Sequence, residues 1–134
     1  MSASKLGQRL AHVANLSTLR LTHYGRRSGK PYEVTIWFLV EDETVYLVTA
    51  NRKRQWPRNV AAHPAVILRI GGETFAGHVE AITDPSAIEH VIDLMAAKYW
   101  YTWPYVWLAR LFGWRVSSAT FRVRVDAELG VSAT

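Results

Sequence analysis

The chain has 134 residues, a formal net charge of +5 and a hydrophobic fraction of 49%. These values predict one folded domain spanning residues 1–134 and argue against extensive disorder. The sequence contains no cysteine, which excludes disulfides, thiolate nucleophiles and cysteine-ligated metals.

The first predicted elements are one helix and three strands. A short amphipathic helix is expected within residues 1–15, where apolar residues recur at helical spacing. Leu16–Tyr24 alternates apolar and polar residues and predicts a half-buried strand. After the loop Gly25–Pro31, the apolar run Tyr32–Val40 predicts one strand that is central in the sheet. Thr44–Ala50 is rich in β-branched and aromatic residues and predicts a third strand.

The second half of the chain mixes helices and strands. A short helix is predicted over Trp56–Ala62, with a proline near each end. Ala65–Ile70 and Thr74–Thr83 predict a hairpin around a Gly-Gly turn. A helix capped by Asp84 is expected to run to about Tyr99.

The final strand is expected over Ala119–Val125, with a frayed tail over residues 126–134. Six strands joined mostly by short turns, without alternating β-α units, argue against a Rossmann sheet. The predicted fold class is therefore mainly β with flanking helices (α+β), arranged as a small closed or split β-barrel.

The loop Gly25–Pro31 is the strongest candidate for a binding site. Two glycines bracket two arginines and a hydroxyl, and a lysine follows, so backbone N–H groups and side chains could together surround an anion. Arginine adds a planar fork of donors suited to phosphate, and lysine adds a point charge. A solvated hairpin tip is the alternative interpretation. A second basic stretch follows at Arg52, Lys53, Arg54 and Arg58.

Other chemistries find little support. The chain has no Gly-x-Ser-x-Gly elbow and no Walker loop. Its five histidines show no metal-binding spacing, so no metal site is predicted. Cations beside many aromatic residues instead suit a flavin-like cofactor, which has phosphates and a flat ring.

Several motifs together resemble a known family. Those motifs are Leu-x-Leu-Thr-x-x before Gly25-Arg26-Arg27-Ser28-Gly29-Lys30-Pro31, then Val34-Thr35-Ile36-Trp37-Phe38, Leu47-Val48-Thr49-Ala50-Asn51, and Trp56-x-x-Asn59 with Ala62-His63-Pro64. The chain is similar, over roughly Leu19 to Val125, to the deazaflavin-dependent nitroreductase family. This family belongs to the split β-barrel flavin- and deazaflavin-binding superfamily.

The resemblance implies a six-stranded, FMN-binding-like split β-barrel that carries an 8-hydroxy-5-deazaflavin coenzyme (coenzyme F420), with FMN as the alternative. It implies hydride transfer from the reduced coenzyme to a flat acceptor such as a quinone, nitroaromatic or enone. The residues it places at the coenzyme are Gly25, Arg26, Arg27, Ser28, Gly29, Lys30, Thr35, Ile36, Trp37, Thr49, Ala50, Asn51, Trp56, Arg58 and Asn59.

The aromatic segment Trp100–Trp114 corresponds in position to the substrate side of that family. The candidate proton donors or substrate contacts are Tyr99, Tyr101 and Tyr105. A core helix, a homodimer interface and peripheral contact with a membrane surface remain alternatives. Pro104 and the charges interrupt the run well short of the roughly 18 apolar residues of a spanning helix.

Three further expectations concern the function, partners and location of the protein. A non-enzymatic flavin or haem carrier is the alternative to the reductase, because fold alone does not settle function. No nucleic-acid partner is expected, since the basic clusters carry no nucleic-acid motif. The N-terminus lacks the apolar core of a secretory signal, which predicts a cytoplasmic protein, with membrane association as the alternative.

Overall fold

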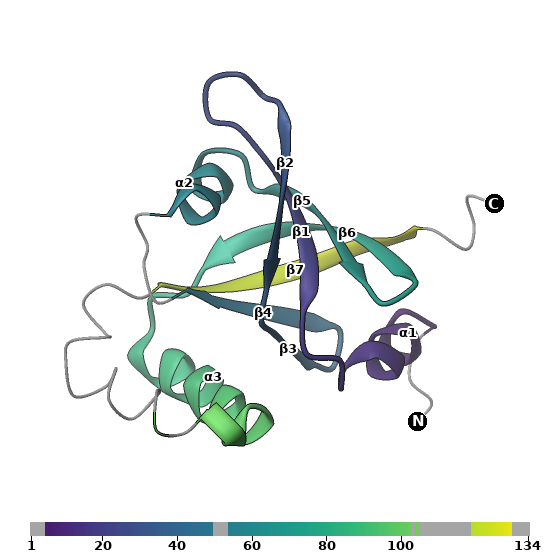
Figure 1. Ribbon diagram of the computed structural model, residues 1–134, viewed down its shortest axis with the longest axis vertical. Helices are drawn as coiled ribbons and strands as arrows, with labels where there is room; N and C mark the ends of the chain where they lie inside the picture. Colours follow the sequence, from purple (N-terminus) through teal and green to yellow (C-terminus); the bar gives the residue numbers. More distant parts are fainter. Residues whose placement is uncertain (1–4, 50–53, 103, 105–118, 130–134) are drawn as a thin grey trace.

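A curled antiparallel sheet dominates the computed structural model, which describes residues 5–49, 54–102, 104 and 119–129 (Figure 1). Within these residues seven strands pair in the order β2-β1-β5-β6-β7-β4-β3. The strands are β1 (Leu19–Tyr24), β2 (Pro31–Ile36), β3 (Phe38–Glu41), β4 (Thr44–Thr49), β5 (Ala65–Ile70), β6 (Glu73–Ala81) and β7 (Ala119–Leu129). The described helical segments are α1 (Lys5–Val13), α2 (Gln55–Ala62), α3 (Pro85–Lys98) and the short 3-10 turn η1 (Trp100–Thr102).

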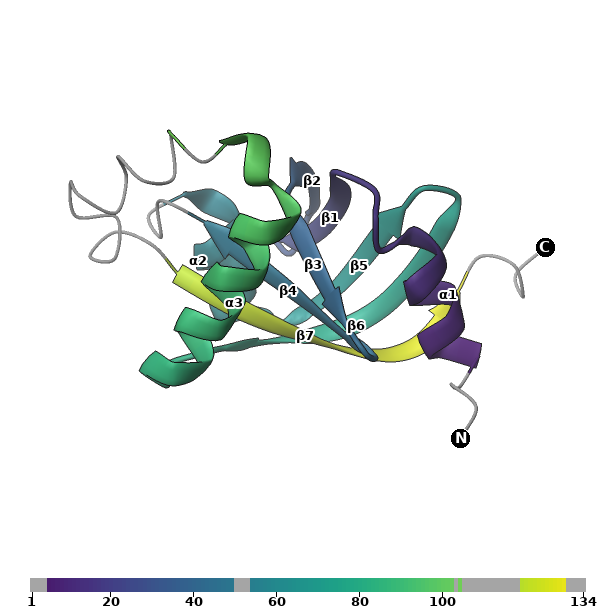
Figure 2. The ribbon, with the colours of Figure 1, turned by 90° about the horizontal axis from the view of Figure 1, so that it is seen from below.

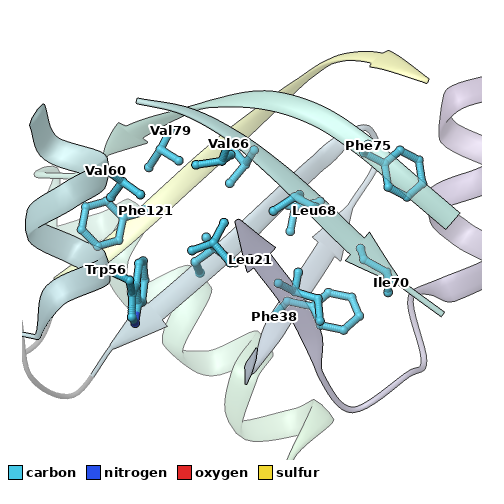
Figure 3. Close-up of a cluster of buried hydrophobic side chains, with 14 of the residues drawn as sticks. Leu21, Phe38, Trp56, Val60, Val66, Leu68, Ile70, Phe75, Val79 and Phe121 are labelled. Carbon is cyan, nitrogen blue, oxygen red and sulfur yellow. The ribbon is translucent and has the colours of Figure 1, made fainter. Parts of the chain in front are cut away.

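The main core lies inside the curl of the sheet. Buried side chains from β1, β3, β4, β5, β6 and β7 form one cluster with residues of α1 and α2. Figure 3 shows Leu21, Phe38 and Leu68 meeting in this cluster, with Trp56 of α2 toward one end. Because strands from both ends of the sheet order contribute to it, the sheet must curve to bury this apolar surface.

Helix α3 covers part of the outer face of the sheet beside β3 and β4, and in the view of Figure 2 it crosses in front of the strands. Leu39, Tyr46 and Val91 form a second, smaller buried cluster there. Asp84 begins the helix as predicted, and its side chain accepts a hydrogen bond from the Ala87 N–H at 3.1 Å. The start of β3 is therefore covered on both faces, which accounts for the apolar run Phe38-Leu39-Val40 before Glu41.

The prediction of one central strand over Tyr32–Val40 is wrong. The run divides at Trp37 into β2 and β3, which lie at opposite ends of the sheet order. This division raises the predicted six strands to seven. The single residue between the two strands, here called the Trp37 corner, therefore links the two edges of the curled sheet.

The C-terminal strand is longer than predicted. β7 continues to Leu129, beyond the expected end at Val125, because it pairs with the long strand β6. A register shift at Ala76/Gly77 interrupts this pairing. The three helices and the hairpin of β5 and β6 agree with the sequence prediction to within a few residues.

Candidate functional site

The loop between β1 and β2 is closed by its own backbone. The Gly25 N–H donates to the Lys30 carbonyl at 2.9 Å, and the Gly29 N–H donates to the Gly25 carbonyl at 3.0 Å. Gly29 has φ +70°, and a Cβ on Gly25 would lie 2.7 Å from Ser28 Oγ. Glycine suits both positions, since it adopts the left-handed conformation of Gly29 readily and leaves room at Gly25 for the Ser28 hydroxyl. The Lys30 N–H also donates to Ser28 Oγ at 3.2 Å, so three of the loop's N–H groups are used within the loop itself.

A cavity of about 640 Å³ lies beside this loop. Its walls come from the end of β1, the loop, the start of β2 and the first turn of α2. The lining residues are His23, Gly25, Arg26, Arg27, Ser28, Tyr32, Glu33, Val34, Arg54, Gln55, Trp56 and Asn59. Three arginines against one glutamate give the cavity a cationic character, and the aromatic rings give it apolar walls.

Arg26 is held in place by α2. Its Nη1 donates to Asn59 Oδ1 at 2.7 Å, and its Nη2 donates to Gln55 Oε1 at 3.1 Å. The guanidinium is thereby attached to one helix face at two points, with further N–H groups available in its planar fork. A charge fixed in this way needs little reorganisation to bind an anion.

His23 lies behind Asn59. Its side chain is buried, and its Nδ1 is 3.0 Å from Asn59 Nδ2. The ring stacks on Tyr32, its partner across β1 and β2, with 5.9 Å between ring centroids. Burial lowers the pKa of His23 below its ordinary value. The imidazole is therefore neutral near pH 7.

The structure brings six of the predicted coenzyme residues together on this cavity: Gly25, Arg26, Arg27, Ser28, Trp56 and Asn59. Gly29 and Lys30 complete the loop and are exposed. Thr35, Ile36 and Trp37 lie further along the edge of the sheet, Arg58 is exposed on α2, and Thr49 is buried at the end of β4; none of them lines the cavity. Ala50 and Asn51 lie outside the described residues.

The predicted substrate tyrosines occupy different environments. Tyr99 is 2% exposed, and its hydroxyl donates to the Ser17 carbonyl at 2.8 Å and accepts from the Phe38 N–H at 3.2 Å. Its ring stacks on Trp37 with 4.3 Å between centroids. This burial disagrees with a direct substrate contact by Tyr99. Tyr101 is exposed, and Tyr105 lies outside the described residues.

Sequence reasoning missed six lining residues, of which Arg54 was noted only as part of a basic stretch. The others are His23, Tyr32, Glu33, Val34 and Gln55. A signal existed for two of them: His23 and Tyr32 flank the loop symmetrically, and a hairpin register would pair them across it. The described residues contain no group of three His, Cys, Asp or Glu side chains able to hold a metal ion.

Solved structures share this fold. A conserved hypothetical protein from Mycobacterium tuberculosis has a TM-score of 0.72 at 20% identity, over 96% of this chain and 84% of that chain. HutZ, the haem storage protein from Vibrio cholerae, has a TM-score of 0.68 at 16% identity, over 92% of each chain. An F420-H2 dependent reductase has a TM-score of 0.63 at 20% identity, over 81% of this chain and 94% of that chain. Such identities establish the fold alone.

The family comparison goes further than the fold. The F420H(2)-dependent quinone reductase family matches residues 1–103, which include the whole cavity. The protein is an oxidoreductase that uses a deazaflavin coenzyme, as the motifs predicted. The chain belongs to the F420H(2)-dependent quinone reductase family. A comparison with curated protein sequences finds no match.

No helix in the described part of the chain is both long and apolar enough to cross a membrane.

Proposed function

We propose that the cavity beside the Gly25–Lys30 loop is the coenzyme F420 site, and that the reduced coenzyme delivers its hydride there to a flat quinone-type acceptor. The observation that carries this proposal is Arg26, whose guanidinium is fixed in the cavity wall by Asn59 and Gln55. A fixed guanidinium is a donor set suited to a phosphate or carboxylate.

The residues present fit such a coenzyme. A volume of about 640 Å³ lies within the roughly 300–1,000 Å³ common for cofactor sites. Arg26, Arg27 and Arg54 supply cations for the phosphate and the acidic tail, and exposed Lys30 lies in the adjoining loop. Tyr32, Val34 and Trp56 supply apolar surface for a flat ring. Glu33 opposes anions at the same wall and would favour binding with the charged tail turned away from it.

The coenzyme, when bound, supplies the hydride chemistry, and the protein's own residues bind and orient it. In this role Arg26 would hold the anionic end, and the apolar wall would exclude water from the ring. Positioning of donor and acceptor then supplies much of the rate enhancement. The proton that accompanies the hydride would come from solvent or from an exposed tyrosine such as Tyr101.

Several finer expectations belong to this proposal. The acceptor would be a quinone, with nitroaromatics and enones as further flat acceptors. Residues 1–134 would form one domain. A homodimer, and contact of the Trp100–Trp114 segment with a membrane surface where quinones dissolve, remain predictions.

The test is a fluorescence titration of the protein with coenzyme F420 and, in parallel, with FMN. The variants are Arg26→Ala and Lys30→Ala, singly and together, and the matched control is Arg69→Ala, an exposed arginine on β5 outside the cavity lining. Losing one charge-assisted hydrogen bond costs roughly 1.5–3 kcal/mol, so Arg26→Ala should weaken F420 binding about 10- to 100-fold. The control should bind like the wild type.

Three outcomes would count against the proposal. Normal F420 binding by a folded Arg26→Ala, Lys30→Ala double variant would move the coenzyme to another site. Tighter binding of FMN than of coenzyme F420 would identify FMN as the cofactor of this site. Tight F420 binding without reduction of any quinone, nitroaromatic or enone would support a carrier instead of a reductase.

A further inference from the structure

The orientation of the Asn59 amide is fixed by the chemistry of its two neighbours. Arg26 can only donate hydrogen bonds, so the group 2.7 Å from its Nη1 must be the amide oxygen. The amide nitrogen of Asn59 then faces His23 Nδ1 at 3.0 Å. Asn59 cannot exchange its oxygen and nitrogen without placing two donors against each other at Arg26.

The same logic fixes the proton on His23. Because the Asn59 amide donates, His23 Nδ1 must accept and cannot carry a proton. The neutral ring therefore carries its proton on Nε2. The lowered pKa of buried His23 agrees with this neutral state. Arg26, Asn59 and His23 thus form a chain of hydrogen bonds in which each member determines the next.

We propose that His23 is a positioning residue for the coenzyme, which holds the Arg26 guanidinium in its binding orientation through Asn59. His23 Nδ1 fixes the rotation of the Asn59 amide, and the amide oxygen fixes Arg26. This inference rests on the proposed coenzyme site, since it assigns to His23 an effect on the anion-binding arginine.

Two features make His23 suited to this task. The ring is held from one side by stacking on Tyr32, so the direction of Nδ1 is set by packing. Asn59 is 4% exposed, and water therefore has little access to replace a lost acceptor at its amide. A side chain without an acceptor at position 23 would leave the Asn59 Nδ2–H unpaired, which removes one of the two restraints on the amide and loosens its hold on Arg26.

The experiment uses two substitutions with opposite expectations. His23→Phe keeps a ring that can stack on Tyr32 but removes the acceptor. His23→Asn restores an acceptor, because an asparagine Oδ1 is attached to Cγ as Nδ1 is in histidine. Arg69→Ala is again the control variant, because Arg69 lies outside the cavity lining.

The first readout needs no coenzyme. The ¹⁵N relaxation of the Arg26 Nε–H in the full chain reports whether the guanidinium is held, and ¹⁵N spectra of His23 report its tautomer. We expect a rigid Arg26 and an Nε2–H tautomer in the wild type. His23→Phe should mobilise Arg26, and His23→Asn should restore its rigidity.

The second readout is the Kd for coenzyme F420. His23→Phe should weaken binding about tenfold, with His23→Asn within about threefold of the wild type. Thermal unfolding by circular dichroism identifies any variant that fails to fold. If His23→Phe does not fold, His23→Asn still tests the proposal. A mobile Arg26 or weak F420 binding in folded His23→Asn would contradict it.

An Nδ1–H tautomer, or a rigid Arg26 in folded His23→Phe, would overturn the inference. A mobile Arg26 with unchanged F420 affinity would also overturn it as a statement about the coenzyme. Failure of the proposed site itself has a different signature, namely normal F420 binding by Arg26→Ala.

Discussion

At the scale of single residues, Tyr99 connects two distant segments of the chain through hydrogen bonds of its hydroxyl. Its hydroxyl joins Ser17, just before β1, to Phe38, the first residue of β3. These two strands belong to opposite halves of the sheet order. A buried hydroxyl with several partners is costly to remove, because those partners lose their hydrogen bonds without access to water.

Tyr99→Phe should therefore lower the free energy of unfolding by about 1–3 kcal/mol. Urea unfolding measures this loss, and steady-state reduction of a quinone measures activity. Both kcat and the Kd for F420 should remain near wild-type values, because the hydroxyl does not line the cavity. A large fall in kcat at unchanged stability would restore Tyr99 as a proton donor.

Lys98 also binds Phe38, at the backbone carbonyl that lies 3.0 Å from the Tyr99 hydroxyl. Its Nζ donates to the Phe38 carbonyl at 2.9 Å and lies 3.7 Å from the centroid of the Phe38 ring. Burial lowers the pKa of Lys98 to about 8. Unfolding returns the amine to water, where it takes up a proton at any pH between about 8 and its ordinary value of 10.5.

Because the unfolded state binds more protons in this window, stability rises with pH there. Wild-type protein should gain stability relative to Lys98→Met as the pH is raised from about 7.5 to about 9.5. Above this range Tyr99, whose pKa burial raises, acts in the opposite direction. Urea midpoints of both proteins across the window give the comparison, and parallel curves would show that Lys98 is not desolvated.

At the scale of elements, the bulge in the long β6–β7 pair depends on a glycine. A Cβ on Gly77 would lie 2.6 Å from the Arg124 carbonyl oxygen and 2.8 Å from a methyl group of Val123. The register shift falls at this position. The two strands approach so closely here that backbone would have to move to admit a methyl group.

Gly77→Ala should destabilise the protein by about 1–3 kcal/mol through overpacking. Gly72→Ala in the neighbouring β5–β6 turn is the matched control, since a Cβ there meets nothing within 4 Å. Its effect should stay within about 0.5 kcal/mol. Equal thermal midpoints for the two variants would contradict this account of the bulge.

The predictability of the elements follows from how local their determinants are. The helix start at Asp84 and the Gly71-Gly72 turn depend on a few adjacent residues, and both could be predicted. The division at Trp37 could not be predicted in this way. It follows from β2 pairing with β1 and β3 with β4, and local periodicity carries no information on such partners.

At the scale of the whole molecule, net charge and site charge act together. The chain carries +5 overall, and three arginines line the cavity. Long-range attraction of this kind is screened over about 10 Å at 0.1 M salt. A coenzyme with several negative charges should consequently bind more weakly as salt increases.

The Kd for F420 should rise several-fold between about 0.05 and 0.5 M KCl, with a shallower slope in Arg26→Ala than in the wild type or in Arg69→Ala. Titrations at four or five salt concentrations measure these slopes. A Kd independent of salt would argue that apolar contacts, instead of the arginines, dominate binding.

The candidate site was also predictable only in part. The loop Gly25–Lys30 and the residues Trp56 and Asn59 could be proposed from motifs, although 33 residues separate Arg26 from Asn59 in the chain. The role of His23 could not, because it arises from the contact of α2 with β1. The burial of Tyr99 could not be predicted either, because an aromatic residue beside an exposed segment gives no local sign of it.

The Trp37 corner has a topological consequence. A peptide cleaved there, or a circular permutant with its new termini there, would keep every strand and every pair of the sheet order. The two edge strands β2 and β3 would nevertheless no longer be joined to each other, so the curled sheet would have two independent edges. The edge formed by β2 carries Tyr32 and Val34, so after such a cut this wall of the cavity would be attached to the sheet only through its pairing with β1.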